Sequence, residues 1–101
     1  MSDTKFAPAM FEILGKAMDE VAREFGAMDL DDPKRGPLLK ELSALTQLRL
    51  WLKSLKSEPN RLLAQPMEEL ARELVALKVR DRRRVQIIAE IMHWSHSLQE
   101  H

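Results

Sequence analysis

Residues 37–56 read PLLKELSALTQLRLWLKSLK, and this leucine-rich stretch decides the fold. Its leucines recur at steps of three and four residues, which places them on one side of an α-helix. The main stripe consists of Leu38, Leu42, Leu45, Leu48, Leu52 and Leu55. Leu39 and Leu50 project from a second flank, and Trp51 widens the main stripe. The stretch predicts an amphipathic helix over residues 37–56 that has more apolar surface than one core face needs.

Proline and glycine divide the chain on both sides of this helix. Apolar residues at helical spacing predict a first helix over residues 8–25, and the Gly- and Pro-containing segment 26–36 cannot continue it. A second loop is expected over residues 57–65. Within it, residues 61–65 would form a short helical turn before Pro66, because a residue that precedes proline resists the helical conformation.

The last third of the chain allows two interpretations. A single long helix could run from residue 66 to the C-terminal region. Alternatively, a helix over 66–80 ends and another over 81–99 begins, with Asp81 as its N-cap. In a continuous helix, Asp81 and Arg84 would interrupt the apolar seam, and we therefore favour the break.

The composition supports helices and narrows the function. The 101 residues include 16 basic and 16 acidic side chains, no cysteine and no tyrosine. Helix-favouring residues dominate, no segment alternates in the manner of a strand, and no internal repeat is evident. We expect an all-α, compact bundle of three or four helices that forms a single domain over residues 1–101. Zero net charge argues against a general polyanion binder, and the lack of cysteine excludes disulfides and thiolate zinc ligands.

The sequence also argues against a membrane protein. Charges interrupt every leucine-rich run well before the ~20 apolar residues that cross a bilayer. The first residues lack the basic and apolar segments of a secretory signal. We therefore expect a soluble, cytoplasmic protein that has no membrane partner.

The C-terminal helix carries more apolar surface than one core requires. Between Val85 and Leu98 the apolar residues cover about 220° of the helix, against roughly 100° or slightly more for a helix on one core. Either this helix is central and wrapped by the others, or part of its surface is an interface, which we favour. The interface would be a homodimer contact or a site for another protein. Its predicted residues are Ile87, Ile91, Trp94 and Leu98, with Leu39, Leu50 and Trp51 of helix 37–56.

A run of arginines precedes this helix. We expect Arg80, Arg82, Arg83 and Arg84 to lie on a solvated helix end and to steer an acidic partner protein. Nucleic acid is the alternative partner, because basic runs also bind phosphates. Residues 69–74 look like the opening of a helix–turn–helix motif, but Asp81 and Arg84 would then occupy its buried apolar positions. That departure excludes the standard motif, and a protein partner is favoured over nucleic acid.

Metal binding and catalysis find little support in the sequence. Glu90, His93 and His96 are spaced three apart, yet a second Glu-x-x-His pair and further inward glutamates are missing. There is no glycine-rich phosphate loop or nucleophile elbow. We therefore expect no metal, no cofactor and no enzyme activity.

These observations predict a small non-enzymatic interaction protein. It would dock on a partner, or on a second copy of itself, by burying the apolar surface of its C-terminal helix. An adaptor or an antagonist that occludes a surface of a regulatory protein fits this description. The alternative is a nucleic-acid-binding regulator that uses the arginine run 80–84.

Overall fold

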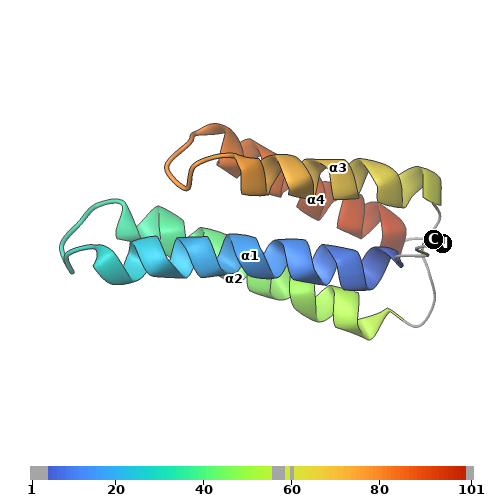
Figure 1. Cartoon of the computed structure of the whole chain (residues 1–101), viewed down its shortest axis with the longest axis horizontal. Helices are drawn as coiled ribbons and strands as arrows, with labels where there is room; N and C mark the ends of the chain where they lie inside the picture. Colours follow the sequence, from blue (N-terminus) through green and yellow to red (C-terminus); the bar gives the residue numbers. More distant parts are fainter. Residues whose placement is uncertain (1–4, 56–58, 60, 100–101) are drawn as a thin grey trace.

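The computed structural model describes residues 5–55, 59 and 61–99, and these form four α-helices and no strand. The helices are α1 (Phe6–Ala27), α2 (Arg35–Ser54), α3 (Arg61–Ala76) and α4 (Arg83–Gln99) (Figure 1). The predicted compact all-α fold is therefore confirmed, with four helices. No helix of the described residues is both long and apolar enough to cross a membrane.

The helices pair into two antiparallel hairpins, α1–α2 and α3–α4, which stack side by side. Figure 1 shows the two turns within the hairpins at the same end of the molecule, so α1 and α3 run in the same direction, as do α2 and α4. α1 packs against α3, and α2 packs against α4. Hairpins stacked in this parallel way are typical of helical repeat arrays.

The core lies between the two hairpins and receives one stripe from each helix. The fully buried apolar side chains include Met10, Leu14, Ala17, Val21, Leu45, Met67, Ala71, Leu74 and Ile91. Burying each of the larger ones stabilises the fold by about 1.5–3 kcal/mol relative to its exposure. Leu38, Leu45, Leu48 and Leu52 of the predicted leucine stripe are all buried in the structure.

The helix boundaries differ from the predicted ones by a few residues, and the start of α3 differs most. α3 begins at Arg61 rather than at residue 66, so the expected short turn is part of the helix and Pro66 lies inside it. Buried Ala64 and Met67 on either side of the proline explain this, because their contacts with the core hold the first turns in place despite the lost hydrogen bond. The predicted break between the last two helices is present, but it is longer than expected: α3 ends at Ala76 rather than at residue 80, and α4 begins at Arg83 rather than at residue 81.

The two hairpin turns are built by the same hydrogen bonds, although the sequence showed no evident repeat. In the first turn, Asp32 Oδ1 accepts the backbone N–H of Lys34 at 2.8 Å, and Asp32 N–H donates to the Asp29 carbonyl at 3.0 Å. In the second turn, Asp81 Oδ1 accepts the N–H of Arg83 at 2.9 Å. The Asp81 N–H donates to the residue three before it, Lys78, at 2.9 Å.

An arginine completes each turn by capping the helix before it. Arg35 Nη1 donates to the carbonyls of Phe25 and Met28 at 3.4 and 3.2 Å. Arg84 Nη1 donates in the same way to the carbonyls of Leu74 and Leu77 at 3.1 and 3.0 Å. The Phe25 and Leu74 carbonyls also accept the backbone N–H of Met28 and Leu77, each at 3.2 Å. At these two carbonyls the arginine is therefore a second donor, and it links the end of one helix to the start of the next.

The repeat becomes visible in the sequence once these bonds align it. Residues 22–35 read AREFGAMDLDDPKR and residues 71–84 read ARELVALKVRDRRR, each at the same distance from its turn aspartate. The identical pairs are Ala22 and Ala71, Arg23 and Arg72, Glu24 and Glu73, Ala27 and Ala76, Asp32 and Asp81, and Arg35 and Arg84. The expectation that the chain has no internal repeat is therefore wrong. The repeat is hard to see in the sequence because the identical residues are few and scattered.

Arg84 differs from Arg35 in its surroundings. The Arg84 side chain is completely buried, and its Nε donates to Glu41 Oε1 of α2 at 2.8 Å. Arg35 is partly exposed, and its guanidinium stacks on the Phe25 ring at 4.1 Å. Arg84 thus joins α2, the end of α3 and the start of α4, whereas Arg35 joins only the helices of its own hairpin.

We predict that Arg84→Ala destabilises the fold by about 3–5 kcal/mol, because it leaves the Glu41 carboxylate buried without its cation. Urea unfolding followed by circular dichroism measures this change. The matched control is Arg82→Ala, since Arg82 is exposed and its loss should change stability by no more than about 0.5 kcal/mol. Equal stability losses for the two variants would contradict the importance of the buried pair.

We also predict acid-sensitive behaviour at the second turn. The hydrogen bonds from the Arg83 side chain and backbone hold the pKa of Asp81 below its ordinary value. A pKa lowered on folding gives stability that is present above the unfolded-state pKa of about 3.9 and is lost as the pH falls through the lower folded pKa. Arg83→Gln should raise the pKa of Asp81 partway to its ordinary value in an NMR titration. An unchanged titration midpoint would contradict the contact.

Candidate functional site

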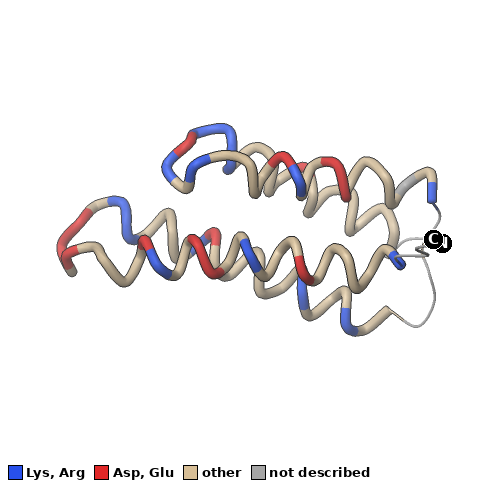
Figure 2. The backbone as a smooth tube through the Cα atoms, in the orientation of Figure 1, with Lys and Arg blue, Asp and Glu red and all other residues tan. Residues whose placement is uncertain are grey.

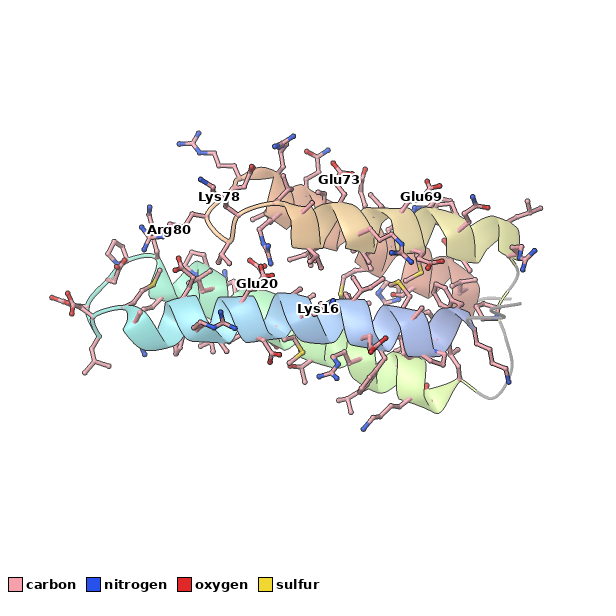
Figure 3. All side chains as sticks on the ribbon, viewed as in Figure 1. Lys16, Glu20, Glu69, Glu73, Lys78 and Arg80 are labelled. Atoms are coloured by element: carbon pink, nitrogen blue, oxygen red, sulfur yellow. The ribbon has the colours of Figure 1, made fainter. Side chains whose placement is uncertain are left out.

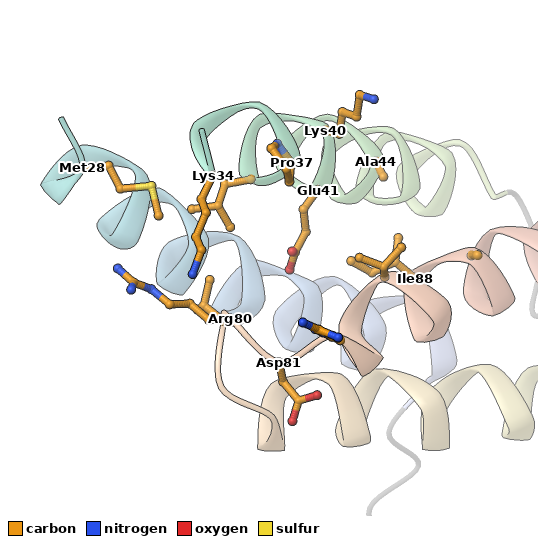
Figure 4. Close-up of a pocket in the computed structure, with 14 residues that line it drawn as sticks. Met28, Lys34, Pro37, Lys40, Glu41, Ala44, Arg80, Asp81 and Ile88 are labelled. Carbon is orange, nitrogen blue, oxygen red and sulfur yellow. The ribbon is translucent and has the colours of Figure 1, made fainter. Parts of the chain in front are cut away.

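A groove of about 530 Å³ runs between the first halves of α2 and α4 (Figure 4), and we call it the α2–α4 groove. Its apolar walls consist of Pro37, Leu38, Ala44, Val85, Ile88 and Ala89. Leu38 and Ile88 are buried and form its floor, while Val85 is 70% exposed. Ala44 and Ala89 are short side chains, which leave space between the helices. Volume and lining are those of an ordinary ligand cleft.

Basic side chains surround this groove at the end near the two turns. Figure 4 shows Lys34 and Arg80 reaching towards the same end of the groove, while Lys40 points outward at its edge. Arg82 lines the same end. Within the described residues, Lys34, Lys40 and Arg82 form no ion pair, whereas Arg80 Nε lies 3.1 Å from Glu24 Oε1. Three cations next to an apolar surface are therefore available to an acidic ligand.

The two acidic groups of the groove are already occupied by the protein. Asp81 pairs with Arg83, with Oδ2 at 3.2 Å from Nη2. Glu41 pairs with buried Arg84, whose Nη2 lies 2.7 Å from Glu41 Oε1 without being aligned for a hydrogen bond. Figure 4 shows Glu41 pointing from α2 into the space between the helices. Neither carboxylate leaves the groove with an uncompensated negative charge.

Three residues of the predicted interaction surface lie inside the bundle instead. Ile87 is 5% exposed and Ile91 is 0% exposed, so both form core contacts and no partner can reach them in this fold. Arg84, predicted to steer a partner from a solvated helix end, is also 0% exposed. Its burial has a clear cause, because Glu41 balances its charge and accepts from Nε, while two carbonyls accept from Nη1.

The other predicted residues remain accessible to different extents. Leu39 and Leu50 of α2 are 56% and 62% exposed. Trp51, Trp94 and Leu98 are half-buried against the core. The structure therefore does not bring the predicted set together into one continuous surface.

Trp94 borders a second, shallower depression of about 300 Å³ on the side of α3 and α4 that faces away from α1 (Figure 3). We call this surface the α3–α4 outer face; its residues are Pro66, Glu69, Leu70, Glu73, Glu90 and Trp94. It combines a small apolar centre with three exposed carboxylates, none of which forms an ion pair within the described part of the chain. Its charge is opposite to that of the α2–α4 groove.

The arginine run does not act as one basic surface. Figure 2 shows an acidic residue within the basic segment between α3 and α4. Arg80 pairs with Glu24, Arg83 with Asp81 and Arg84 with Glu41, and Arg82 forms no ion pair with any residue that the structure describes.

Histidines and acidic residues do not converge on a metal site in the described residues. His93 and His96 are both exposed. His93 contacts the edge of the Trp94 ring, with 6.5 Å between the ring centroids.

Sequence reasoning missed the α2–α4 groove because its walls look like ordinary core positions. Leu38 and Ile88 fall on apolar stripes in either case. The available signal was the small size of Ala44 and Ala89, which matters only once α2 and α4 are known to be neighbours.

Comparisons with known proteins give no relative: no family model, no curated protein and no solved structure matches this chain.

Proposed function

We propose that this protein is a non-enzymatic interaction module that holds an acidic amphipathic helix of a partner protein in the α2–α4 groove. The observation that carries the proposal is the combination of an apolar floor with cations that form no ion pair with the described part of the chain. An acidic amphipathic helix has the matching chemistry, because it presents an apolar stripe and carboxylates beside it. As a third helix, it would lie along the two parallel helices that form the walls.

Apolar contact would supply most of the affinity. Ile88 and Leu38 form a floor against which leucine-sized side chains can pack, and Val85 is 70% exposed at the edge. Fully burying a valine- or leucine-sized side chain contributes about 1.5–3 kcal/mol, whereas an exposed ion pair contributes only about 0–1 kcal/mol. The exposed apolar residues therefore support binding, and the cations support the choice of partner.

Charge would orient the ligand and select it. Lys34, Lys40 and Arg82 give the groove a positive edge, and opposite charges on a partner raise the association rate and disfavour basic competitors. A regulatory protein whose acidic helix is held in this way would have one face of that helix blocked. The module would then act as an antagonist of that regulatory protein.

Nucleic acid is the less favoured partner. Phosphate binding requires several cations that can reach the backbone together. Three of the four arginines in the run 80–84 already have acidic partners in this structure, and Arg84 is buried. A homodimer through α4 stays a prediction, and the carboxylates beside Trp94 weigh against a symmetric contact there.

We predict that the groove distinguishes an acidic from a basic amphipathic peptide. The probes are two synthetic helices of about 18 residues, or ~27 Å, each with a leucine stripe and with Glu or Lys on its other positions. The Glu peptide should bind at least about tenfold more tightly by fluorescence anisotropy, and raised salt should weaken it only moderately.

The matched variants are Ala89→Glu, which places a carboxylate in the groove, and Ala22→Glu on the exposed surface of α1. The first should abolish the preference for the Glu peptide and the second should leave it intact. Equal behaviour of the two variants, or tight DNA binding with a steep salt dependence, would count against the proposal.

A further inference from the structure

The hairpin repeat indicates what the α3–α4 outer face can bind, because the matching face of the first hairpin is covered by α3–α4. In the first hairpin, Ala17, Val21 and Leu45 are completely buried in the core that the two hairpins share. The turns align α1–α2 with α3–α4, and this alignment matches these three residues with Pro66, Leu70 and Trp94. The second set is only half-buried and lines the α3–α4 outer face. The face that α3–α4 covers on the first hairpin is thus left open on the second.

The charges of the two faces correspond as well. In the first hairpin, Glu24 pairs with Arg80 at 3.1 Å and Glu41 pairs with Arg84 at 2.7 Å. The alignment matches Glu24 with Glu73 and Glu41 with Glu90. Both of these carboxylates are exposed and lack an ion pair within the described residues.

A third pair of matching carboxylates shows the same difference between the two hairpins. Glu20 lines a small depression together with Lys78 and Arg80 at the junction of the two hairpins. Its counterpart is Glu69, which lines the α3–α4 outer face. Figure 3 shows Glu20 on α1 and Glu69 and Glu73 on α3, with Lys78 and Arg80 beyond the end of α3.

We propose that the α3–α4 outer face docks a helical hairpin of another protein, stacked as α3–α4 stacks on α1–α2. The partner hairpin carries two arginines four positions apart, one in the turn between its helices and one in the first turn of its second helix, as Arg80 and Arg84 are placed here. One arginine reaches Glu73 and the other reaches Glu90, while an apolar side chain covers Trp94. This surface and its basic partner are separate from the α2–α4 groove and its acidic ligand.

A second copy of this chain fits the face less well. The positions in its first hairpin that match Lys78 and Arg80 are Asp29 and Asp31, which would meet Glu69 and Glu73 with like charge. Like charges placed together at an interface disfavour the wrong partner. The first hairpin is also capped on its outer side.

That cap consists of two cations on one aromatic ring. The Arg49 guanidinium lies 3.8 Å from the centroid of the Phe11 ring, and Lys53 Nζ lies 5.2 Å from it. Polar side chains over the outer face are what a terminal repeat needs to remain unpaired. Among the described residues, no lysine or arginine lines the α3–α4 outer face, and Trp94 is only half-buried there. This face therefore has no comparable cap.

The test uses the full chain as its own probe. All association variants carry Arg49→Leu, which removes the capping arginine and introduces the leucine of the matching position 98. In this background, Asp29→Lys combined with Asp31→Arg gives the first hairpin the basic turn of the second, including an arginine four positions before Arg35. Sedimentation velocity over a concentration series should show the wild type largely monomeric. The double variant should associate head to tail at least about tenfold more tightly, because a heterologous contact of this kind extends from copy to copy.

Three further changes in the double-variant background assign the contact. Trp94→Ala, and Glu73→Lys combined with Glu90→Lys, should each return association to the wild-type level. Gln47→Ala is the control, because Gln47 is exposed on α2 and lines neither the α3–α4 outer face nor the α2–α4 groove, so its loss should leave association unchanged. Circular dichroism confirms that every variant is folded.

Two outcomes would overturn the proposal. If the double variant associates no more than the wild type, or associates independently of Trp94 and the two glutamates, the face does not dock a basic hairpin. If the wild type associates through Trp94 as tightly as the double variant does, the occupant is a second copy of this chain. The like charges of Asp29 and Asp31 then do not prevent self-association. Neither outcome bears on peptide binding in the α2–α4 groove, which the Ala89→Glu variant tests separately.

Discussion

A single buried cation fixes how the two hairpins meet. Arg84 has no exposed surface, and a guanidinium without water must be paired and hydrogen-bonded or it opposes folding by several kcal/mol. Glu41 supplies the charge from α2, and the carbonyls of Leu74 and Leu77 supply the remaining acceptors from the end of α3. These partners exist only when α3 ends where it does and α4 begins beside α2. The pair therefore specifies the arrangement, in addition to any stability it contributes.

The same turn tolerates a very different setting in the first hairpin. Arg35 caps α1 with equivalent hydrogen bonds, yet it remains partly exposed and rests on the Phe25 ring. The cap alone therefore does not require burial. Burial follows when a neighbouring helix places a carboxylate within hydrogen-bond distance of the guanidinium, as α2 places Glu41 beside Arg84. One local motif thus serves as a simple helix cap in one hairpin and as the junction between hairpins in the other.

Much of the fold followed from the sequence, because periodicity reports which residues of a helix face inward. The leucine stripe of α2 and the break near Asp81 were both predictable, since Asp81 and Arg84 fit no continuous apolar seam. Periodicity does not report what covers a face. The pattern predicts Arg84 in solvent, because its partner Glu41 is far away in the sequence. It predicts Ile87 and Ile91 at an interface, because the pattern of one helix indicates neither the neighbours of α4 nor the hairpin repeat.

The apolar excess of α4 has an explanation that the single helix could not provide. One part of its surface, with Ile87 and Ile91, lies in the core. A second part, with Ile88 and Ala89, forms a wall of the basic α2–α4 groove. A third part, with Trp94, lies on the acidic α3–α4 outer face. Because α4 separates two surfaces of opposite charge, the zero net charge of the chain hides a division between them. A helix that borders a core and two such surfaces needs apolar residues on most of its circumference, which is the arc observed in the sequence.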